Sequence, residues 1–281
     1  MKRLVQLLCL IVLTGTFFVL AGCNRGNRFS THTISDEQYY RFNFENGIGP
    51  MDHFVGEVVS YNLVWPDKGA ISPAAERDLM FLCFGDSTAS DVKEAAYNWL
   101  EATSMASFEY LDDILVEMVD DLDEKDLAYC KMESSCQQDS QLATFIVRNE
   151  SFWPRAVHGI YSVDYLTVDL ENGNTIHLAD LVVDTNLLCE AIAHAIQDLD
   201  VNKETRECLF DEFVDVDRMP MPHNFAVDSA RNNINVFYGL YEITPYCCGI
   251  QSIILPIFWL SKHVPLTTYA KRLFGPESYL E

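Results

Sequence analysis

Residues 161–178, with the sequence YSVDYLTVDLENGNTIHL, form the stretch that decides the fold class. Tyr161 to Leu170 is rich in aromatic and β-branched residues, which predicts a strand, and Thr175 to Leu178 is the expected return strand. Between them, Glu171-Asn172-Gly173-Asn174 has Asn-Gly at its centre. This dipeptide favours the tight turn of a hairpin, because glycine accepts a positive φ at little cost. The stretch therefore predicts two antiparallel strands.

Strands and helices follow one another on both sides of this hairpin. Aromatic and β-branched runs predict further strands at residues 39–44, 55–65, 142–147, 225–227, 234–240 and 250–255. Apolar spacing and capping residues predict helices at residues 73–83, 91–106, 108–126, 184–199 and 256–264. Strand pairs next to helices indicate an α+β fold with mainly antiparallel sheets and packed helices, rather than a doubly wound parallel sheet.

The composition favours some classes of partner and excludes others. The chain has 281 residues, of which 49% are hydrophobic and 12% aromatic, as expected of a folded globular protein. Asp and Glu number 42 against 19 Lys and Arg, which gives a net charge of -23. Such a chain has few cations with which to neutralise phosphates, so we expect no nucleic acid as a partner. The same charge suits a cationic partner, or simply a soluble acidic surface.

The first residues are expected to lie outside the fold. A short basic segment precedes an uncharged apolar run from Leu4 to Leu20, and Leu20-Ala21-Gly22-Cys23 resembles a bacterial lipobox. The resemblance implies cleavage before Cys23, lipidation of its thiol and acylation of its new amine, whereas the alternative is an uncleaved membrane helix. The lipoprotein interpretation predicts a protein of the cell envelope, lipid-anchored to a bacterial membrane. No acidic cluster follows Cys23, which favours a periplasm-facing position.

These signals divide the chain into five predicted segments. They are a signal peptide (1–22), a flexible tether (23–38), an N-terminal α+β domain (39–160), a C-terminal α+β domain (161–265) and a C-terminal tail (266–281). The tether is predicted from its polar residues, which are rich in Gly, Ser and Thr.

The cysteines carry less information than the turn and the lipobox. Cys130 and Cys136 could close a short loop through a disulfide. Neither a C-x-x-C motif nor a Cys/His spacing typical of zinc occurs, so we expect no structural metal and no cofactor.

Two stretches of the chain match the pattern of a known family. The first consists of His158-Gly159, residues 161–170, Asn172-Gly173, His177-Leu178 and Asp180-Leu181. The second consists of Asn224-Phe225, Phe237-Tyr238, residues 241–246 (YEITPY), Gly249 and Leu255-Pro256. Over residues 39–264 the chain resembles the paired domains of unknown function 4163 (N-terminal) and 3298 (C-terminal) of bacterial lipoproteins.

This domain pair forms the extracellular part of an anti-sigma factor that serves as a lysozyme receptor, and it precedes the catalytic domain of some peptidoglycan deacetylases. The resemblance therefore implies a binding or sensing module whose partner is a lysozyme-like protein or peptidoglycan. Four residues are candidates for ligand contact, and each also fits a structural role in a turn or in packing. They are His158, Tyr241, Glu242 and Tyr246. The chain departs from the family pattern at Ala156-Val157, Cys247-Cys248 and Ile257.

Enzymatic and metal-binding interpretations of other motifs are weaker. Phe84-Gly85-Asp86-Ser87 resembles the nucleophile block of GDSL-type esterases, but no histidine stands three residues after an aspartate, as that chemistry requires. An EF-hand loop that starts at Asp121 would lack the glycine at its sixth position and the glutamate at its twelfth. The metal motif of the deacetylases is absent, so no catalytic residue is assigned.

Two hypotheses for the function follow. The first is a non-catalytic envelope lipoprotein that binds or senses a cell-wall component or a lysozyme-like protein. The second is an envelope hydrolase with an unrecognised site, for example Ser87, or a carboxylate that acts with His158. The missing catalytic set and the net charge favour the first hypothesis.

Overall fold

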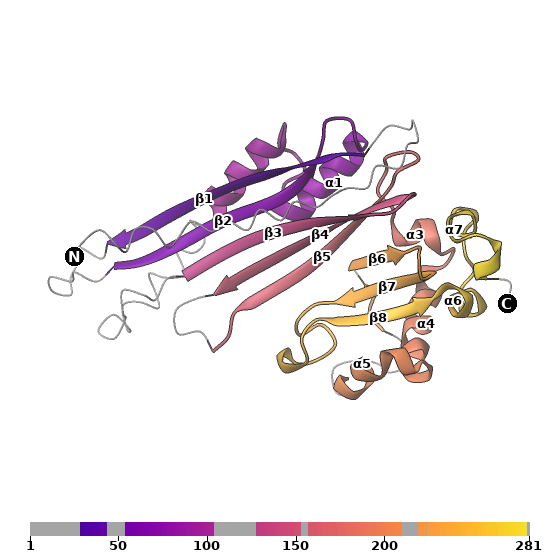
Figure 1. Ribbon diagram of the computed structural model, residues 1–281. Helices are drawn as coiled ribbons and strands as arrows, with labels where there is room; N and C mark the ends of the chain where they lie inside the picture. Colours follow the sequence, from indigo (N-terminus) through magenta and orange to yellow (C-terminus); the bar gives the residue numbers. More distant parts are fainter. Residues whose placement is uncertain are drawn as a thin grey trace, which may run out of the picture.

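The computed structural model describes residues 29–43, 54–103, 128–152, 157–209, 219–222 and 224–279. Two sheets and their helices make up this part of the chain, which confirms the predicted α+β class (Figure 1). The predicted signal peptide, Cys23 and the acidic helix predicted at 108–126 lie outside the described residues.

A five-stranded sheet is the larger layer, with the strands in sequence order. They are β1 (Thr31–Asn43), β2 (Phe54–Pro66), β3 (Ala128–Gln138), β4 (Leu142–Phe152) and β5 (Ile160–Asp169). Neighbours are antiparallel except β2 and β3, which are parallel. Parallel strands need a long crossover, and α1 (Pro73–Phe84) and the helical residues 92–103 lie on that crossover.

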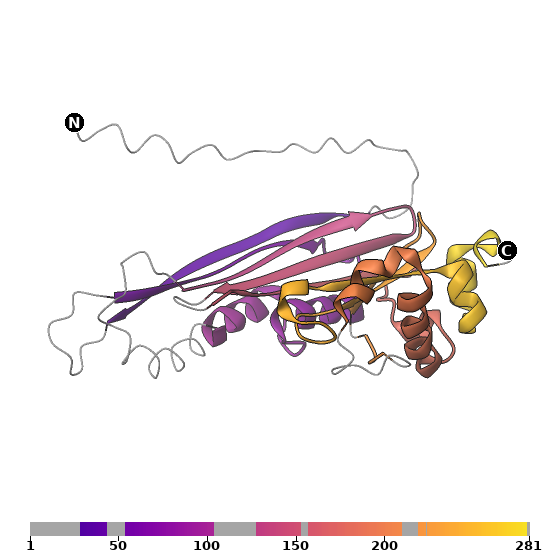
Figure 2. The ribbon, with the colours of Figure 1, turned by 90° about the horizontal axis from the view of Figure 1, so that it is seen from below.

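The crossover helices cover one face of this sheet, while the opposite face carries no described helix (Figure 2). The core between sheet and helices contains Trp65, Leu79 and Phe145. Because side chains alternate across a strand, the intervening residues point to the uncovered side, and they include Lys131 and Arg148. We call this uncovered side the open face.

A three-stranded antiparallel sheet lies beside β5 (Figure 1). It consists of β6 (Asn224–Asp228), β7 (Asn233–Tyr238) and β8 (Gln251–Pro256). The helices of this half are α3 (Leu178–Leu181), α4 (Thr185–Asp198), α5 (Lys203–Cys208), α6 (Ile257–His263) and α7 (Thr268–Phe274).

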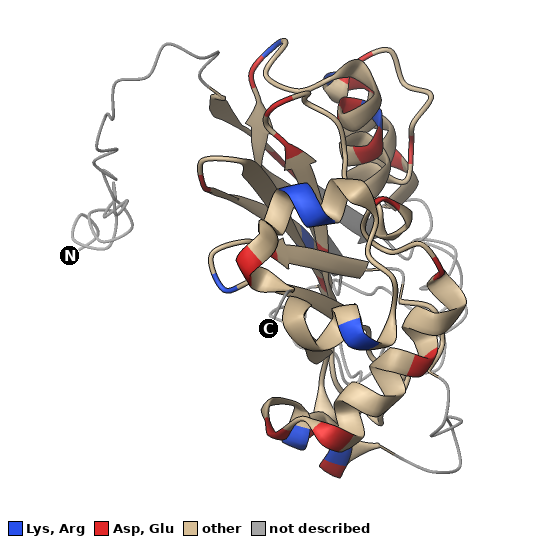
Figure 3. Ribbon diagram, turned by 90° about the vertical axis from the view of Figure 1, so that its right-hand side faces the viewer, with Lys and Arg blue, Asp and Glu red and all other residues tan. Residues whose placement is uncertain are grey.

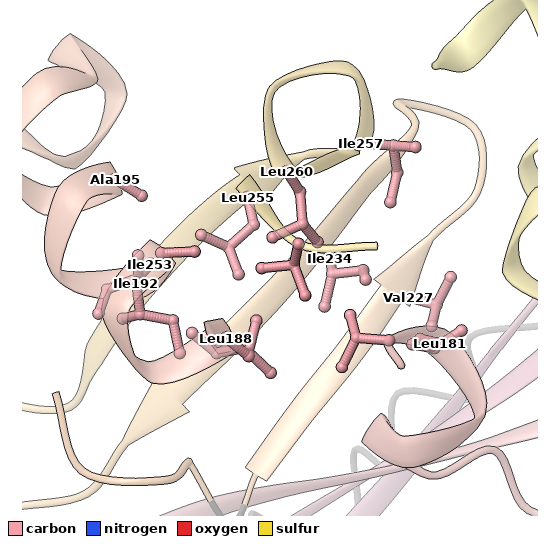
Figure 4. Close-up of a cluster of buried hydrophobic side chains, with 14 of the residues drawn as sticks. Leu181, Leu188, Ile192, Ala195, Val227, Ile234, Ile253, Leu255, Ile257 and Leu260 are labelled. Atoms are coloured by element: carbon pink, nitrogen blue, oxygen red, sulfur yellow. The ribbon is translucent and has the colours of Figure 1, made fainter. Parts of the chain in front are cut away.

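A second hydrophobic core lies between this smaller sheet and its helices (Figure 4). Leu188 and Ile192 of α4 pack with Ile234, Ile253 and Leu255 of the sheet, and all five side chains are fully buried. Full burial of one such aliphatic side chain contributes about 1.5–3 kcal/mol, so this core holds the smaller sheet in place.

The side chain of Asn224 joins the two sheets. Its Nδ2 donates to Val163 O at 2.6 Å and to Asp164 Oδ1 at 3.2 Å, and its Oδ1 accepts from Tyr165 N at 3.0 Å. A carboxamide offers the same donor and acceptor as a peptide group. Asn224 therefore forms hydrogen bonds with the backbone of β5 as a residue of a neighbouring strand would. We call this junction of β5 with β6 and β7 the seam.

The structure differs from the predicted segment boundaries in three places. Residues 31–38, predicted as part of a flexible tether, form the first part of β1 and pair with β2 from Thr31 onward. Their polar character suggested a linker, but an exposed edge strand needs no apolar alternation. β5 begins at the predicted boundary at residue 160, yet it completes the five-stranded sheet. The predicted tail contains α7, whose Ala270 and Phe274 are buried in the second core.

The turn at Asn172-Gly173 is confirmed. Gly173 has a φ of 72°, and its N–H donates to Asp169 O at 2.7 Å. A Cβ on Gly173 would also lie 3.0 Å from Ser72 N, so glycine is required for space as well as for conformation. The return strand predicted at 175–178 is reduced to one antiparallel bridge between Thr175 and Val168, beside which Ile176 N donates to Thr167 O at 2.9 Å. The chain then enters α3, and the main partner of β5 is β4.

The disulfide considered for Cys130 and Cys136 is also wrong. Both residues lie on β3, a strand that the sequence did not predict. Six residues of extended strand separate their Cα atoms by about 20 Å, whereas a disulfide requires about 7 Å or less.

Substitution of Asn224 tests whether the seam holds the sheets together. We expect Asn224→Ala to lower the free energy of unfolding by about 2–4 kcal/mol, because three hydrogen bonds are lost at roughly 1 kcal/mol each. Urea unfolding measures the change. The matched control is Asn98→Ala, which removes one exposed 3.4 Å contact with Asp86 and should stay within about 0.5 kcal/mol of wild type. Equal losses for both variants would contradict the role assigned to the seam.

Candidate functional site

The four residues predicted for ligand contact lie together at one end of the seam. His158 precedes β5, Tyr241 and Glu242 lie in the turn after β7, and Tyr246 begins η3 (Tyr246–Cys248). The rings of His158 and Tyr246 are stacked, with centroids 3.6 Å apart and an interplanar angle of 17°. The Tyr241 hydroxyl lies 3.4 Å from His158 Nε2.

A fifth residue, Tyr161 of β5, belongs to the same group. Its ring meets the Tyr246 ring edge-on, at a centroid distance of 6.4 Å, and the Tyr241 ring lies 5.8 Å from Tyr246 on another side. We call His158, Tyr161, Tyr241 and Tyr246 the aromatic platform. The sequence pattern did not single out Tyr161, because its aromatic ring alone fits any strand.

Local backbone geometry explains how His158 and Tyr246 meet. The Tyr246 hydroxyl donates to Gly159 O at 2.7 Å, and His158 Nδ1 lies 3.1 Å from the same oxygen. A Cβ on Gly159 would stand only 2.9 Å from Ser151 O of β4. Glycine is therefore the residue that lets the chain pass this close to β4.

Tyr241 is held in an unusual conformation. Its φ is 64°, in the left-handed region that bulky residues rarely adopt, and its side chain is 64% exposed. The neighbouring Glu242 carboxylate accepts a hydrogen bond from Gly239 N and so closes the turn. Strained backbone that presents an exposed ring is a reason to suspect function, because packing alone does not require it.

A groove on the open face lies along the seam, and none of the four platform residues lines it. Its volume is about 670 Å³, and its lining includes Thr144 and Ile146 of β4, Tyr165 of β5, and Asn235 and Phe237 of β7. The Tyr165 and Phe237 rings stack in it across the seam, with centroids 4.1 Å apart and an angle of 9°. Arg148 and Arg231 also line the groove.

One polar atom of the groove lacks a partner. Asn235 Oδ1 is buried and accepts no hydrogen bond from the described residues. Its surroundings could not be predicted from the sequence, because they form only where two distant segments meet.

Asp164 is a half-buried carboxylate at the seam. Burial raises its pKa above the usual value, the negative charge of Glu242 raises the pKa further, and a hydrogen bond from Ser162 partly opposes both effects. The strand alternation of β5 places Asp164 on the helix-covered side with Leu166, away from Tyr161 and Tyr165. Asp164 is therefore next to the platform but not on its exposed surface.

The structure gives the esterase-like segment a structural role. Gly85 ends α1 with a φ of 67°, and Asp86 Oδ1 accepts from Thr88 N at 2.7 Å and from Thr88 Oγ1 at 2.8 Å. These hydrogen bonds lower the pKa of Asp86 and fold the loop. Within the described part of the chain, no hydrogen bond connects Ser87 to a histidine.

Among the described residues, no three His, Cys, Asp or Glu side chains form a group suited to a metal ion. Among the same residues, no helix has the length and apolarity required to traverse a bilayer. Cys23, the predicted lipidation site, lies outside them.

Two solved structures share this fold. A member of the domain of unknown function 3298 family from Bacteroides fragilis gives a TM-score of 0.62 at 17% identity, over 87% of this chain and 96% of that chain. A protein of the same family from Pseudomonas aeruginosa gives 0.51 at 12% identity, over 89% of this chain and 98% of that chain. Searches against protein-family models and against curated proteins found no match.

The likeness supports the part of the resemblance that concerns domain 3298. At these identities it shows a common fold and no common ligand. The likeness to domain 4163 stays a prediction.

Replacement of Asp164 tests the effect of its burial on stability. A raised pKa in the folded state means that this carboxyl group stabilises the fold only while protonated, and the contribution is lost as pH rises through the folded-state pKa. We expect Asp164→Asn to raise the melting temperature at pH 7. The difference should shrink as pH falls through the folded-state pKa and vanish below about 4, where both states protonate the aspartate. The control Glu190→Gln, on the exposed side of α4, should show no such trend. A less stable Asp164→Asn protein at pH 7 would contradict this account.

Proposed function

We propose that this chain is a non-catalytic lipoprotein of the bacterial cell envelope that binds peptidoglycan through the aromatic platform. The observation that carries the proposal is the Tyr241 ring, 64% exposed in a left-handed turn beside the stacked His158 and Tyr246 rings. An arrangement of this kind presents apolar ring faces and polar ring tips to solvent. Sugar rings offer the complementary combination of C–H faces and hydroxyl groups.

The groove supports a ligand longer than one sugar. Tyr161 and Tyr165 lie on the same face of β5, four residues and about 13 Å apart. An elongated glycan could therefore contact the platform with one part and the Tyr165–Phe237 stack with another. Arg148 at the groove suits a carboxylate of the ligand, because a guanidinium binds carboxylates through paired hydrogen bonds.

The lipobox supports the location at a membrane of the envelope. Thr31, at which β1 starts, lies eight positions after Cys23. A chain of that length spans at most about 28 Å when fully extended. A lipid on Cys23 would thus keep the sheets close to the membrane surface and within reach of peptidoglycan.

A lysozyme-like protein is the second candidate partner, and the net charge of -23 favours it. Complementary charge speeds association with a basic protein and is weakened by salt. Seen from the end at which α6 and α7 lie, acidic and basic residues are interspersed (Figure 3).

The hydrolase hypothesis rests on a narrower basis. A carboxyl group of raised pKa beside a second carboxylate, here Asp164 and Glu242, is the pairing that glycosidases use. Asp164, however, accepts hydrogen bonds from Ser162 and Asn224 and faces the covered side of β5. Both ring nitrogens of His158 also have partners, namely Gly159 O and the Tyr241 hydroxyl. The binding hypothesis accounts for these contacts without a catalytic role.

Removal of the Tyr241 ring tests the platform. The soluble mature chain with Cys23→Ser is titrated with soluble peptidoglycan fragments and incubated with isolated sacculi. We expect Tyr241→Gly to weaken binding at least about 10-fold, as for a buried aromatic contact worth more than about 1 kcal/mol. Glycine relieves the positive φ, so the unfolding free energy should stay within about 1 kcal/mol of wild type.

The matched control is Tyr97→Ala, which removes a tyrosine that is 58% exposed on the helical residues 92–103. Its binding should equal that of wild type. Binding to a basic lysozyme that persists at physiological salt, without binding to sacculi, would replace the glycan with the second candidate. Hydrolysis of the fragments that Asp164→Asn or Glu242→Gln abolishes would establish the hydrolase instead.

A further inference from the structure

Two exposed histidine rings meet where α4 packs against α6. The ring centroids of His194 and His263 lie 6.2 Å apart, with an interplanar angle of 32°. Both residues are exposed, although the residues on either side of His194 are buried. The two histidines are far apart in the sequence, so only the packing of the helices brings their rings together.

The buried sides of both helices fix the positions of the two rings. Ile192 of α4 and Leu260 of α6 are fully buried in the second core, so neither helix can shift without opening that core (Figure 4). His263 is the last residue of α6, and its ring stacks on the Trp259 ring with centroids 3.9 Å apart and an angle of 23°. Trp259 packs against the same core. The His263 ring therefore rests on a supported surface.

A hydrogen bond to the backbone decides which nitrogen of His263 can bind an ion. Its Nδ1 lies 2.9 Å from Trp259 O. A carbonyl oxygen only accepts hydrogen bonds, so Nδ1 carries the proton, and in the neutral ring Nε2 has the free lone pair. Histidines that bind metal ions in proteins typically donate their other ring N–H to a backbone carbonyl or a carboxylate in the same way. His263 is thus oriented as an Nε2 ligand.

The charges around the histidine pair favour a cation. Glu190 and Asp198 lie one helical turn before and one turn after His194 on α4, and both are exposed. Lys262 of α6 places its Nζ over the Phe258 ring, 4.1 Å from the ring centroid, so its ammonium group is engaged there. The net charge of -23 also raises the concentration of divalent cations near the whole chain.

We propose that His194 and His263 bind a divalent ion of the late transition metals, such as Zn²⁺, Ni²⁺ or Cu²⁺, through one ring nitrogen each. Imidazole is a preferred ligand of these ions. A bound ion lies about 2.1 Å from an imidazole nitrogen and hence roughly 3.2 Å from the ring centre. Twice that distance slightly exceeds the observed 6.2 Å, so one ion can reach both rings at their present separation. A small rotation of the side chains then adjusts the angle at the metal.

Water or a donor from another molecule would complete the coordination of the ion. In the part of the chain that the structure describes, no third His, Cys, Asp or Glu side chain is grouped with the pair. A structural zinc site has four protein ligands, and a catalytic site usually has three. The histidine pair is therefore an open surface site with an exchangeable ion, on which the fold does not depend. The proposal is independent of the aromatic platform and of the ligand proposed for it.

The test uses Zn²⁺, because this ion is diamagnetic and leaves the NMR signals of its ligands visible. The mature chain with Cys23→Ser is first treated with iodoacetamide, which blocks accessible thiols that would otherwise compete for the ion. We expect Zn²⁺ to shift the ring-nitrogen signals of His194 and His263 and of no other histidine. Calorimetric titration of the same protein gives the Kd for Zn²⁺.

Single substitutions show whether both histidines are needed. His194→Ala and His263→Ala should each weaken Zn²⁺ binding at least about 10-fold, because each removes one of the two protein ligands. The matched control is His32→Ala, which removes a half-exposed histidine whose Nδ1 also has an acceptor, Asp67 Oδ1 at 2.9 Å. The control should bind Zn²⁺ as wild type does. Unchanged signals of His194 and His263 in Zn²⁺ would overturn the proposal, and so would full binding by either variant or an equal loss in the control.

Discussion

The open edge of β5 is the constraint on which the rest of the structure depends. β5 pairs with β4 on one side, so its other edge presents backbone N–H and C=O groups that need partners. Asn224 supplies a donor and an acceptor to Val163 and Tyr165, and the smaller sheet begins from that residue. A strand in full register would have merged the two sheets. One carboxamide instead joins them at a point, and the groove and the aromatic platform lie along the line of contact.

The platform depends on backbone features that are specific to its position. Gly159 passes too close to Ser151 O for any side chain, which brings His158 within stacking distance of Tyr246. Tyr241 adopts a φ of 64°, which holds its ring out from the turn. These features contribute little to either hydrophobic core, since the cores are formed by α1 and the larger sheet and by α4 and the smaller one. The platform is thus an addition to a fold that is stable for other reasons.

Local signals allowed much of the fold to be predicted, and long-range contacts account for what was missed. Ser72 caps the start of α1, and Pro73 is its first residue. Asp184 caps α4 by accepting hydrogen bonds from Asn186 N and Leu187 N. Both helices therefore begin close to where the sequence predicts them. Residues 31–38 and β3 are strands whose polar side chains resemble those of a linker until their neighbours are known. The family resemblance identified His158 and Tyr246. Tyr161, the Tyr165–Phe237 stack and the pairing of His194 with His263 arise only from the meeting of distant segments.

Several unfavourable features of the described residues lie at the seam, and they are a reason to look for function there. Burial and the neighbouring Glu242 both disfavour the charged form of Asp164. Asn235 has a buried oxygen without a partner among the described residues. Tyr241 has a positive φ, which is unfavourable for a residue with a bulky side chain. Each feature lowers stability, and simple substitutions would remove each of them. Binding sites often retain such features, because a ligand needs the polar atoms and rings that they display. Since Tyr241 belongs to the platform and Asn235 lines the groove, the seam is the surface at which a partner should be sought.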